Sequence, residues 1–319
     1  MANIQEHILV IRLGALGDLI FCLQAFHEIR QAHPHAKIAL LTRAPFAAFA
    51  EKMPYFDSII IDTHPTFTRP LAWVKLLKAI RGFVPTRVYD LQGKPRQSVL
   101  YTLLGGPFVP PWSGAAPFCK FPRLWPPSPD MSFPAFLGTQ LRLADVPSST
   151  PVSLDWLTAG VEKFALPSSY VVLVPGCSPE ASYKRWPASH YAMLAHKFHE
   201  HKIACVVVGG PDDRGAAAEI KATAPYAIDL CGQTNLFELA AVLRKAEGVI
   251  GNDTGPLHMA ASVGATTLAL FSGRSNPVWS KPPGPRSAVI QSPLLSDLSA
   301  DKVFTAFNIL LKHTEGKGT

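Results

Sequence analysis

Residues 7–33 read HILVIRLGALGDLIFCLQAFHEIRQAH, a strand-like run followed by a glycine-bearing turn and a helix-like run. The first part, His7–Arg12, is rich in β-branched residues, which are typical of buried strands. Apolar residues then recur at helical spacing over Gly17–His33. A strand that leads through a short turn into a helix is the opening of a βαβ unit. This segment therefore predicts a parallel sheet covered by helices.

The same alternation continues along the chain. In the first half we expect strands at Lys37–Leu41, Ser58–Ile61 and Arg87–Leu91 and a helix at Leu71–Phe83. In the second half we expect strands at Tyr170–Val174, Ile203–Val208, Gly248–Ile250 and Thr266–Phe271. Helices are expected there at Ala188–His199, from Asp213, at Leu236–Lys245 and at Thr254–Val263. The pattern predicts an α/β protein with two Rossmann-like domains, residues 1–160 and 161–319.

Residues Gly105–Pro151 break this alternation, because prolines crowd the segment. Proline has no backbone N–H and ends helices, so regular helix or central strand is not expected over much of it. The segment predicts a long loop, either ordered or mobile.

Composition excludes several classes of protein. Apolar residues make up 48% of the 319 residues and charged residues 17%, unlike a disordered chain. No apolar run approaches the roughly 18 residues of a membrane span, and the first residues lack the pattern of a signal peptide. The five cysteines form no CxxC pair, which argues against a disulfide framework or a zinc site. We expect a cytoplasmic protein.

Positive charge is concentrated in the first half of the chain. Residues 1–160 hold 15 Lys and Arg against 10 Asp and Glu, and the remainder holds 15 against 13. This excess suits an anionic ligand or a membrane surface. Nucleic-acid binding is not expected, because no basic run is interleaved with aromatic residues.

The glycine-bearing turn RLGALGD, Arg12–Asp18, is the first candidate site. Gly14 and Gly17 let a ligand approach the backbone, and the helix start offers N–H groups to an anion. The turn is neither GxGxxG nor a P-loop. Asp18 is either an acid that complements the helix dipole or a functional carboxylate at the open end of the sheet.

A second candidate follows the strand that ends at Val174. The loop contains Gly176 and Ser178 and leads to the pair Lys184–Arg185. Loops after parallel strands hold phosphates with backbone N–H groups and a lysine charge, although a solvated basic pair is the alternative.

The third candidate is GNDTGPLHMAA, Gly251–Ala261. The helix start at Thr254 and Gly255 could bind a diphosphate, and Asp253 could bind sugar hydroxyls. An ordinary capped helix with a packed His258 is the alternative. Two further glycine turns, Gly209–Asp213 and Phe271–Pro277, also follow strands.

Four motifs in this order resemble the ADP-heptose:lipopolysaccharide heptosyltransferase family of inverting GT-B glycosyltransferases. They are RLGALGD, YDLQG at Tyr89–Gly93, KRWP at Lys184–Pro187 and GNDTGPLHMAA. The resemblance covers about residues 7–280. It implies two Rossmann-like domains whose parallel sheets face a central cleft, with the acceptor on the first domain and the nucleotide sugar on the second.

The resemblance also implies roles for matching residues. Asp18 matches the general base, Lys184 the lysine that neutralises the donor diphosphate, and Asp253 the aspartate near the donor sugar. Thr254 and Gly255 match the phosphate-holding helix start, and Asp212 or Asp213 falls near the donor ribose. We place Gly176, Ser178 and His258 on the donor side and Gly14, Gly17 and Gln92 on the acceptor side.

These roles imply heptose transfer from ADP-heptose to a lipid-linked oligosaccharide acceptor, without a metal or other cofactor. Because the base and the diphosphate site lie on different domains, catalysis implies closure of the cleft. The chain departs from the family at Gln24, where proline is common, and in the loop Ser272–Pro277. Peripheral contact with the inner face of the inner membrane is expected from the basic first half, helped by Trp112 and Trp125.

Three other functions remain open. The motifs predict diphosphate binding better than the sugar, so a different nucleotide sugar is one alternative. A sugar-nucleotide 2-epimerase shares the fold but needs further acid and base residues, which the sequence does not reveal. A non-catalytic binding protein is the third. An NAD-dependent dehydrogenase is disfavoured, since GxGxxG with a following acidic residue is absent from the sequence.

Overall fold

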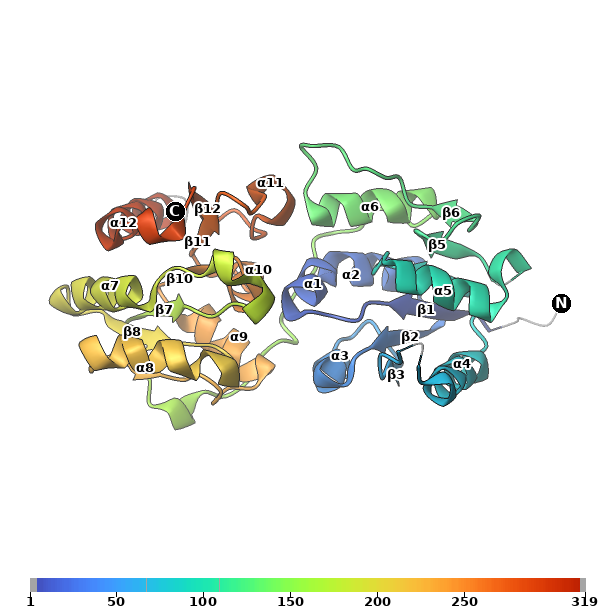
Figure 1. Cartoon of the computed structure of the whole chain (residues 1–319), viewed down its shortest axis with the longest axis horizontal. Coiled ribbons are helices and arrows are strands. Elements are labelled where there is room, and N and C mark those ends of the chain that lie inside the picture. The colour runs from blue at the N-terminus through green and yellow to red at the C-terminus, as the bar shows by residue number, and fades with distance from the viewer. Residues whose placement is uncertain (1–4, 67, 109, 316–319) are drawn as a thin grey trace. The chain divides into compact units, whose positions relative to one another are not determined.

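The computed structural model describes residues 5–66, 68–108 and 110–315, so the outermost residues of both predicted domains lie outside it. The chain forms two compact units, Met1–Trp156 and Leu157–Thr319. Each unit is an α/β sandwich around its own sheet (Figure 1). Within the described ranges, none of the helices is long and apolar enough to cross a membrane.

The first unit is built on a six-stranded parallel sheet in the order β3-β2-β1-β4-β5-β6. The strands are β1 His7–Ile11, β2 Lys37–Thr42, β3 Ser58–Ile61, β4 Arg87–Asp90, β5 Trp112–Gly114 and β6 Phe121–Pro122. The helices are α1 Leu16–Phe21, α2 Leu23–Ala32, α3 Ala47–Ala50, α4 Pro70–Phe83, α5 Pro95–Leu104 and α6 Phe133–Leu143. The four strands and the helix α4 expected from the sequence are confirmed.

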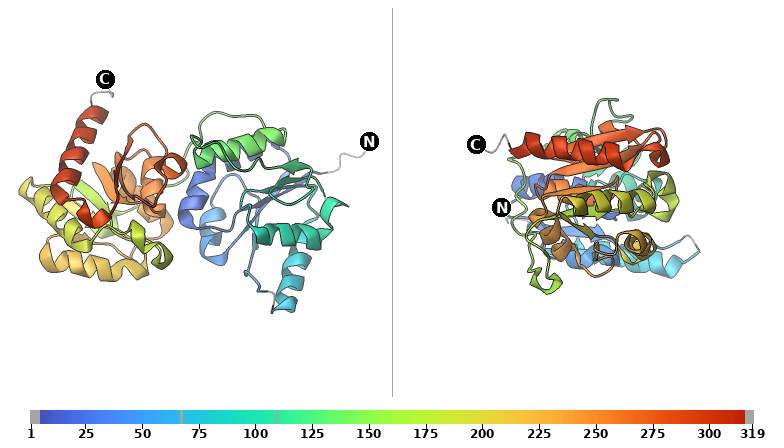
Figure 2. Two further views of the ribbon diagram at one scale, coloured as in Figure 1. Left: turned by 45° about the horizontal axis from the view of Figure 1, so that its top comes forward. Right: turned by 90° about the vertical axis from the view of Figure 1, so that its left-hand side faces the viewer.

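Helices cover both faces of this sheet. On one face, Leu9 and Ile11 of β1 pack with Trp73 and Leu76 of α4 and Leu100 of α5. On the other face α2 packs against α6. Figure 2 shows α6 and α5 on opposite sides of the sheet. Connecting loops lie at the carboxyl ends of the strands, where ligand sites form in such folds.

The proline-rich segment is more regular than predicted. It contributes β5, β6 and helix α6, and α5 just before it was also not expected. β5 contains no proline, and Pro122 lies in the edge strand β6, where a missing N–H interrupts no ladder. Trp112, expected at a membrane surface, is instead 1% exposed and packs edge-on against Tyr101 at 5.2 Å. That expectation was wrong.

The helix expected over Gly17–His33 is divided. α1 ends at Phe21, and Cys22 separates it from α2. The backbone N–H of Cys22 donates to Leu19, three residues back, which tightens the turn there. The break falls between residues of the predicted apolar face, so both helices keep that face.

The second unit has a matching sheet in the order β12-β11-β10-β7-β8-β9, also parallel. Its strands are β7 Tyr170–Val174, β8 Ala204–Val207, β9 Ile228–Asp229, β10 Gly248–Asn252, β11 Thr267–Ser272 and β12 Ser287–Ser292. The helices are α7 Ala188–Glu200, α8 Arg214–Thr223, α9 Leu236–Lys245, α10 Gly255–Ser262, α11 Pro277–Ser280 and α12 Ala300–Glu315. The four predicted strands and four predicted helices are confirmed; β9, β12, α11 and α12 are additional.

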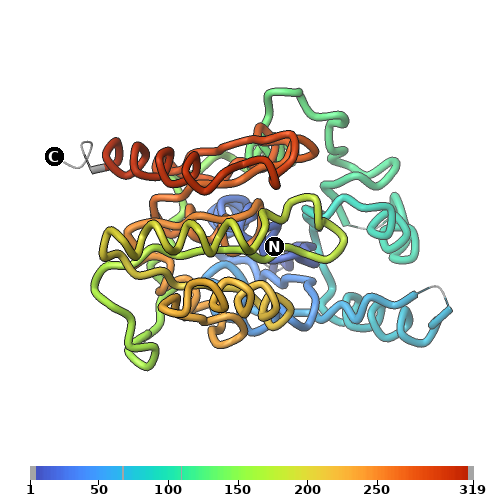
Figure 3. Tube along the Cα trace, turned by 60° about the vertical axis from the view of Figure 1, so that its left-hand side comes forward, coloured from blue at the N-terminus to red at the C-terminus, as the bar shows by residue number. Residues whose placement is uncertain are grey.

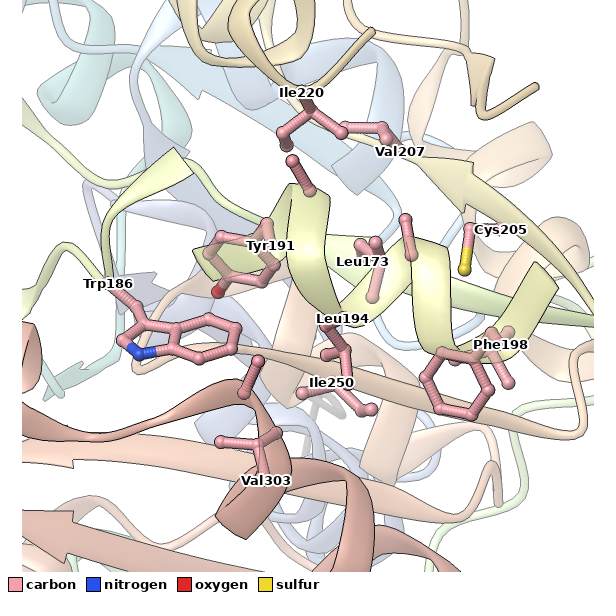
Figure 4. Packing of buried hydrophobic residues seen from close by; sticks show 14 of the residues in the cluster. Leu173, Trp186, Tyr191, Leu194, Phe198, Cys205, Val207, Ile220, Ile250 and Val303 are labelled. Atoms are coloured by element: carbon pink, nitrogen blue, oxygen red, sulfur yellow. The ribbon is translucent and has the colours of Figure 1, made fainter. Parts of the chain in front are cut away.

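On one face of this sheet α7 lies between α12 and α8 (Figure 3). Trp186, Tyr191 and Phe198 fill the core beneath them and are fully buried (Figure 4). The indole N–H of Trp186 donates to the Leu298 carbonyl at 2.8 Å. Trp186 belongs to the KRWP motif, so this core fixes the backbone that carries Lys184.

Candidate active site

The loop after β1 requires glycine at residue 14. Gly14 has φ +111°, and a Cβ there would lie 2.2 Å from the Phe46 ring. An L-residue would be strained by its backbone and would collide with the ring. The loop backbone is therefore packed directly against Phe46.

Asp18 stands in the first turn of α1 and has two partners. Its Oδ2 accepts the backbone N–H of Ala15 at 3.1 Å and forms an ion pair with Nη2 of Arg12 at 2.8 Å. Arg12 is 4% exposed and also donates to the Leu91 carbonyl at 2.6 Å. The Asp18 side chain remains 43% exposed. Its position fits both hypotheses, because it completes the helix start and leaves the carboxylate accessible.

The YDLQG motif is joined to this loop. Oε1 of Gln92 accepts the backbone N–H of Leu13 at 3.0 Å, across neighbouring strands. Asp90 is fully buried and accepts the backbone N–H groups of Gln92 and Gly93. Burial raises the pKa of Asp90 to about 6, against the opposing effect of those hydrogen bonds. Gln92 and Gly14 both line a pocket of about 220 Å³, whereas Gly17 lies in α1.

In the second unit Asp253 joins Lys184 and His258. Nζ of Lys184 lies 2.6 Å from Oδ2 of Asp253, and Nε2 of His258 lies 3.0 Å from Oδ1. Asp253 is 2% exposed and Lys184 25%. Burial alone would raise the pKa of Asp253, but its contacts with His258 and Lys184 outweigh burial and lower it. The three predicted residues thus form one charged cluster.

This cluster sits at the start of α10. Thr254 is the N-cap residue, and its hydroxyl donates to the Asn252 carbonyl at 3.3 Å, two residues back. Among the described residues, the first turn therefore has no side-chain cap. Gly255 is the first residue of the helix. Backbone N–H groups of an uncapped first turn are available to an anion.

Asn252 holds the loops of this site together and is not identified by sequence reasoning. Its Oδ1 accepts the Trp186 backbone N–H and the Tyr191 hydroxyl, both at 3.0 Å. Its Nδ2 donates to the Pro175 carbonyl at 2.7 Å. A buried asparagine beside Asp253 at the end of a strand was the available signal. Arg12, a charged residue at the end of β1, was similarly overlooked.

The remaining predicted donor residues lie on neighbouring loops. A Cβ at Gly176 would lie 2.3 Å from the Asp213 carboxylate, so the two predicted residues are in contact. Asp213 accepts the Gly210 backbone N–H at 2.8 Å, and burial raises its pKa overall. Ser178 and Asp212 are exposed at the starts of short 3-10 turns.

Comparison with known proteins identifies the family. The model of glycosyltransferase family 9 (heptosyltransferase) matches residues 133–303, more than half of the chain. The chain belongs to this family. The predicted resemblance and the enzyme class, a glycosyltransferase, are thereby confirmed.

Individual heptosyltransferases align with this chain over different lengths. Lipooligosaccharide heptosyltransferase 2 of Haemophilus influenzae is 31% identical over 124 residues, which span 36% of this chain and 36% of that relative. The Haemophilus ducreyi protein of the same name is 23% identical over 320 residues, 89% of this chain and 88% of the relative. The solved structure of E. coli ADP-heptose LPS heptosyltransferase II superposes with a TM-score of 0.78 at 21% identity, covering 97% of this chain and 99% of the other. This likeness confirms the predicted α/β fold of the GT-B type.

Proposed function

We propose that this family 9 glycosyltransferase moves a heptose from ADP-heptose to a lipopolysaccharide core acceptor with inversion. The observation that carries the proposal is the Lys184–Asp253–His258 cluster at the uncapped start of α10. It places a cation and free backbone N–H groups where a diphosphate can bind. The names of the H. ducreyi and E. coli relatives support heptose as the sugar and ADP-heptose as the donor.

Asp18 is the proposed general base. It takes the proton from the acceptor hydroxyl while that oxygen bonds to the anomeric carbon and the bond from this carbon to the diphosphate oxygen breaks. Nη2 of Arg12 lies 2.8 Å from this carboxylate and holds it in place. Inversion follows from one in-line displacement, in which ADP departs with the electron pair of the broken bond.

The second unit is proposed as the donor domain. Lys184 and the Thr254–Gly255 helix start would stabilise the charge that develops on ADP. Asp253 would meet sugar hydroxyls, with His258 fixing its orientation at 3.0 Å. The loops with Gly176, Ser178, Asp212 and Asp213 would contact the nucleoside.

The first unit is proposed as the acceptor domain. Gly14, Gly17 and Gln92 are its proposed acceptor-side residues, and Gly14 and Gln92 line the pocket of this unit. The proposal includes no metal or other cofactor. A transferase of the same family that uses a different nucleotide sugar is the main alternative, since diphosphate groups are common to all such donors.

A donor panel tests this function. Purified protein is incubated with ADP-heptose, ADP-glucose, UDP-glucose, UDP-N-acetylglucosamine and GDP-mannose, with and without a lipopolysaccharide core acceptor, and nucleotide release is measured. We expect acceptor-dependent ADP release from ADP-heptose alone. Faster release from another donor would reassign the sugar, and isomerisation of a nucleotide sugar without acceptor would favour an epimerase.

We also propose peripheral contact of the first unit with an anionic membrane, at the inner face of the inner membrane. Helix α4 exposes Leu71 and Val74, which are 77% and 58% exposed, and also carries exposed lysines and an arginine. Trp125, 73% exposed, is a further apolar contact. Basic helices with exposed apolar residues bind anionic bilayers through electrostatic attraction to the lipid head groups and through burial of the apolar side chains.

Binding to anionic liposomes is expected to fall steeply as salt is added. Electrostatic attraction is screened within about 8 Å at physiological ionic strength, so contacts spread over a surface weaken most. Cosedimentation with phosphatidylglycerol vesicles at low and high salt measures this, with ADP affinity as the comparison. Equal salt sensitivity of vesicle and ADP binding would remove the case for a basic membrane-facing surface.

A further inference from the structure

Two loops of the second unit meet at the carboxyl end of β10. In the strand order β11-β10-β7, β10 lies between the other two strands, and all three are parallel. The loops after β11 and β7 nevertheless touch, because Cζ of Arg274 lies 4.4 Å from the centre of the Tyr183 ring. Asp253 directly follows β10 at the same edge of the sheet. The Arg274–Tyr183 contact therefore spans the edge at which the proposed diphosphate site lies.

The backbone of the loop after β11 is fixed on both sides of Arg274. The side-chain amide of Gln291 donates to the carbonyls of Ser272 and Ser275, both at 3.1 Å. The backbone N–H of Ser275 also donates to the Ser272 carbonyl at 3.0 Å. Arg274 is thus carried by a loop that is already ordered, so binding through its side chain loses little backbone entropy.

The cations nearest the start of α10 are compensated within the protein. Lys184 is paired with Asp253 at 2.6 Å, so their charges cancel in the free protein. Arg185 donates to the Cys177 carbonyl at 3.2 Å, and its charge partly offsets the effect of burial on the pKa of Asp213. A diphosphate is a polyanion and needs more positive charge than this arrangement leaves free.

The charge of Arg274 is available. The residue is exposed, and the described part of the chain provides no carboxylate or carbonyl partner for its guanidinium. Contact with the Tyr183 ring leaves the guanidinium N–H groups free to donate. Because these groups are planar and paired, they match two oxygens of a phosphate.

We propose that Arg274 is a further donor-binding residue, which supplies a second cation beside Lys184 for the donor diphosphate, and that Tyr183 is the positioning residue that holds it there. The guanidinium donates to phosphate oxygens and stabilises the negative charge that develops on them as the bond to the sugar breaks. This inference rests on the proposed donor role of the second unit. It adds a residue that recognises the diphosphate rather than the nucleoside or the sugar.

Nucleotide binding to the full chain tests the role of Arg274. ADP is titrated by calorimetry, and adenosine, the phosphate-free probe, by ligand-observed NMR. Arg274→Gln is expected to weaken ADP binding by at least about tenfold, because a charge-assisted contact is lost, and to leave adenosine binding unchanged.

Arg286→Gln is the matched control. Arg286 is exposed like Arg274, but it directly precedes β12, which runs parallel to β11, and so lies at the opposite edge of the sheet. Its replacement removes the same charge from the same unit. ADP affinity of Arg286→Gln should therefore equal that of the unmodified protein.

Variants of Tyr183 test the positioning role. Tyr183→Phe keeps the ring and should bind ADP normally, whereas Tyr183→Leu removes it and should weaken ADP binding roughly two- to fivefold. A positioning residue acts only through the residue that it positions. In the Arg274→Gln background, Tyr183→Leu should therefore cause no further loss of ADP affinity.

Unchanged ADP affinity in Arg274→Gln, an equal loss in Arg286→Gln, or an equal loss for adenosine would each overturn the role of Arg274. A further loss from Tyr183→Leu in the double variant would overturn the role of Tyr183. Lys184→Met separates this inference from the proposed function. If Lys184→Met weakens ADP binding and Arg274→Gln does not, this inference alone is wrong. If neither variant weakens it, the proposed donor site is wrong as well.

Discussion

Asp18→Asn is expected to abolish heptose transfer while the protein stays folded and donor affinity changes by less than about tenfold. The amide keeps the size of the carboxylate and an oxygen that can accept the Ala15 N–H, but it cannot take a proton from the acceptor. Loss of a positioned base lowers rates by about 10²–10⁴-fold. The measurement is kcat from acceptor-dependent ADP release, with donor affinity from calorimetry.

Asp57→Asn is the matched control for this variant. Asp57 pairs with Arg30 at 2.6 Å and accepts the Ile38 backbone N–H at 2.7 Å, as Asp18 does with Arg12 and Ala15. Its side chain is 50% exposed. Both variants therefore lose an ion pair and keep an oxygen that can accept the backbone N–H, and only Asp18→Asn should lose turnover. Equal turnover in the two variants would exclude Asp18 as the base.

Lys184→Met is expected to weaken ADP and ADP-heptose binding together. Methionine keeps most of the apolar stem and removes the charge that would face the diphosphate. A charge-assisted contact contributes about 1.5–3 kcal/mol, so affinity should fall by roughly ten- to 150-fold. The variant also leaves Asp253 without a cation on one side, which adds repulsion toward phosphate.

Lys197→Met separates this effect from general loss of an ion pair. Lys197 lies on α7 of the same unit, pairs with Asp301 at 2.5 Å and is 28% exposed, close to the 25% of Lys184. Calorimetry should show normal ADP affinity for Lys197→Met. If Lys184→Met bound ADP equally well, the diphosphate role of Lys184 would be wrong.

Sequence reasoning predicted the elements whose signals are local. The bounds of β3 and α9 agree with the structure, and for α9 the reason is visible: Asn235 caps the helix and Glu238 returns a hydrogen bond to it. The strands β5 and β9 span three and two residues, too short for any periodicity, and exist through pairing with neighbouring strands. Their positions depend on the whole sheet.

The same distinction applies to the site. Lys184 and Asp253 stand in recognisable motifs, so their types and order along the chain suggested a common site, and their 2.6 Å contact agrees with it. The partners that orient them could not be predicted. Arg12 and Asn252 acquire their meaning from tertiary surroundings: Arg12 is a buried guanidinium paired with Asp18, and the Asn252 amide bridges three groups.

The contact between Lys184 and Asp253 has a consequence for the order of binding and release. In the free protein the carboxylate of Asp253 is already paired with Lys184. It therefore competes with any phosphate for the lysine. An anion without a sugar must displace the Asp253 carboxylate from Lys184, which leaves Asp253 in contact with His258 alone. On the proposed roles, an intact donor compensates the displacement, because its sugar hydroxyls bind the carboxylate that its diphosphate has set free. The product ADP carries no sugar that could bind Asp253. The carboxylate therefore pairs with Lys184 again, which favours release of ADP.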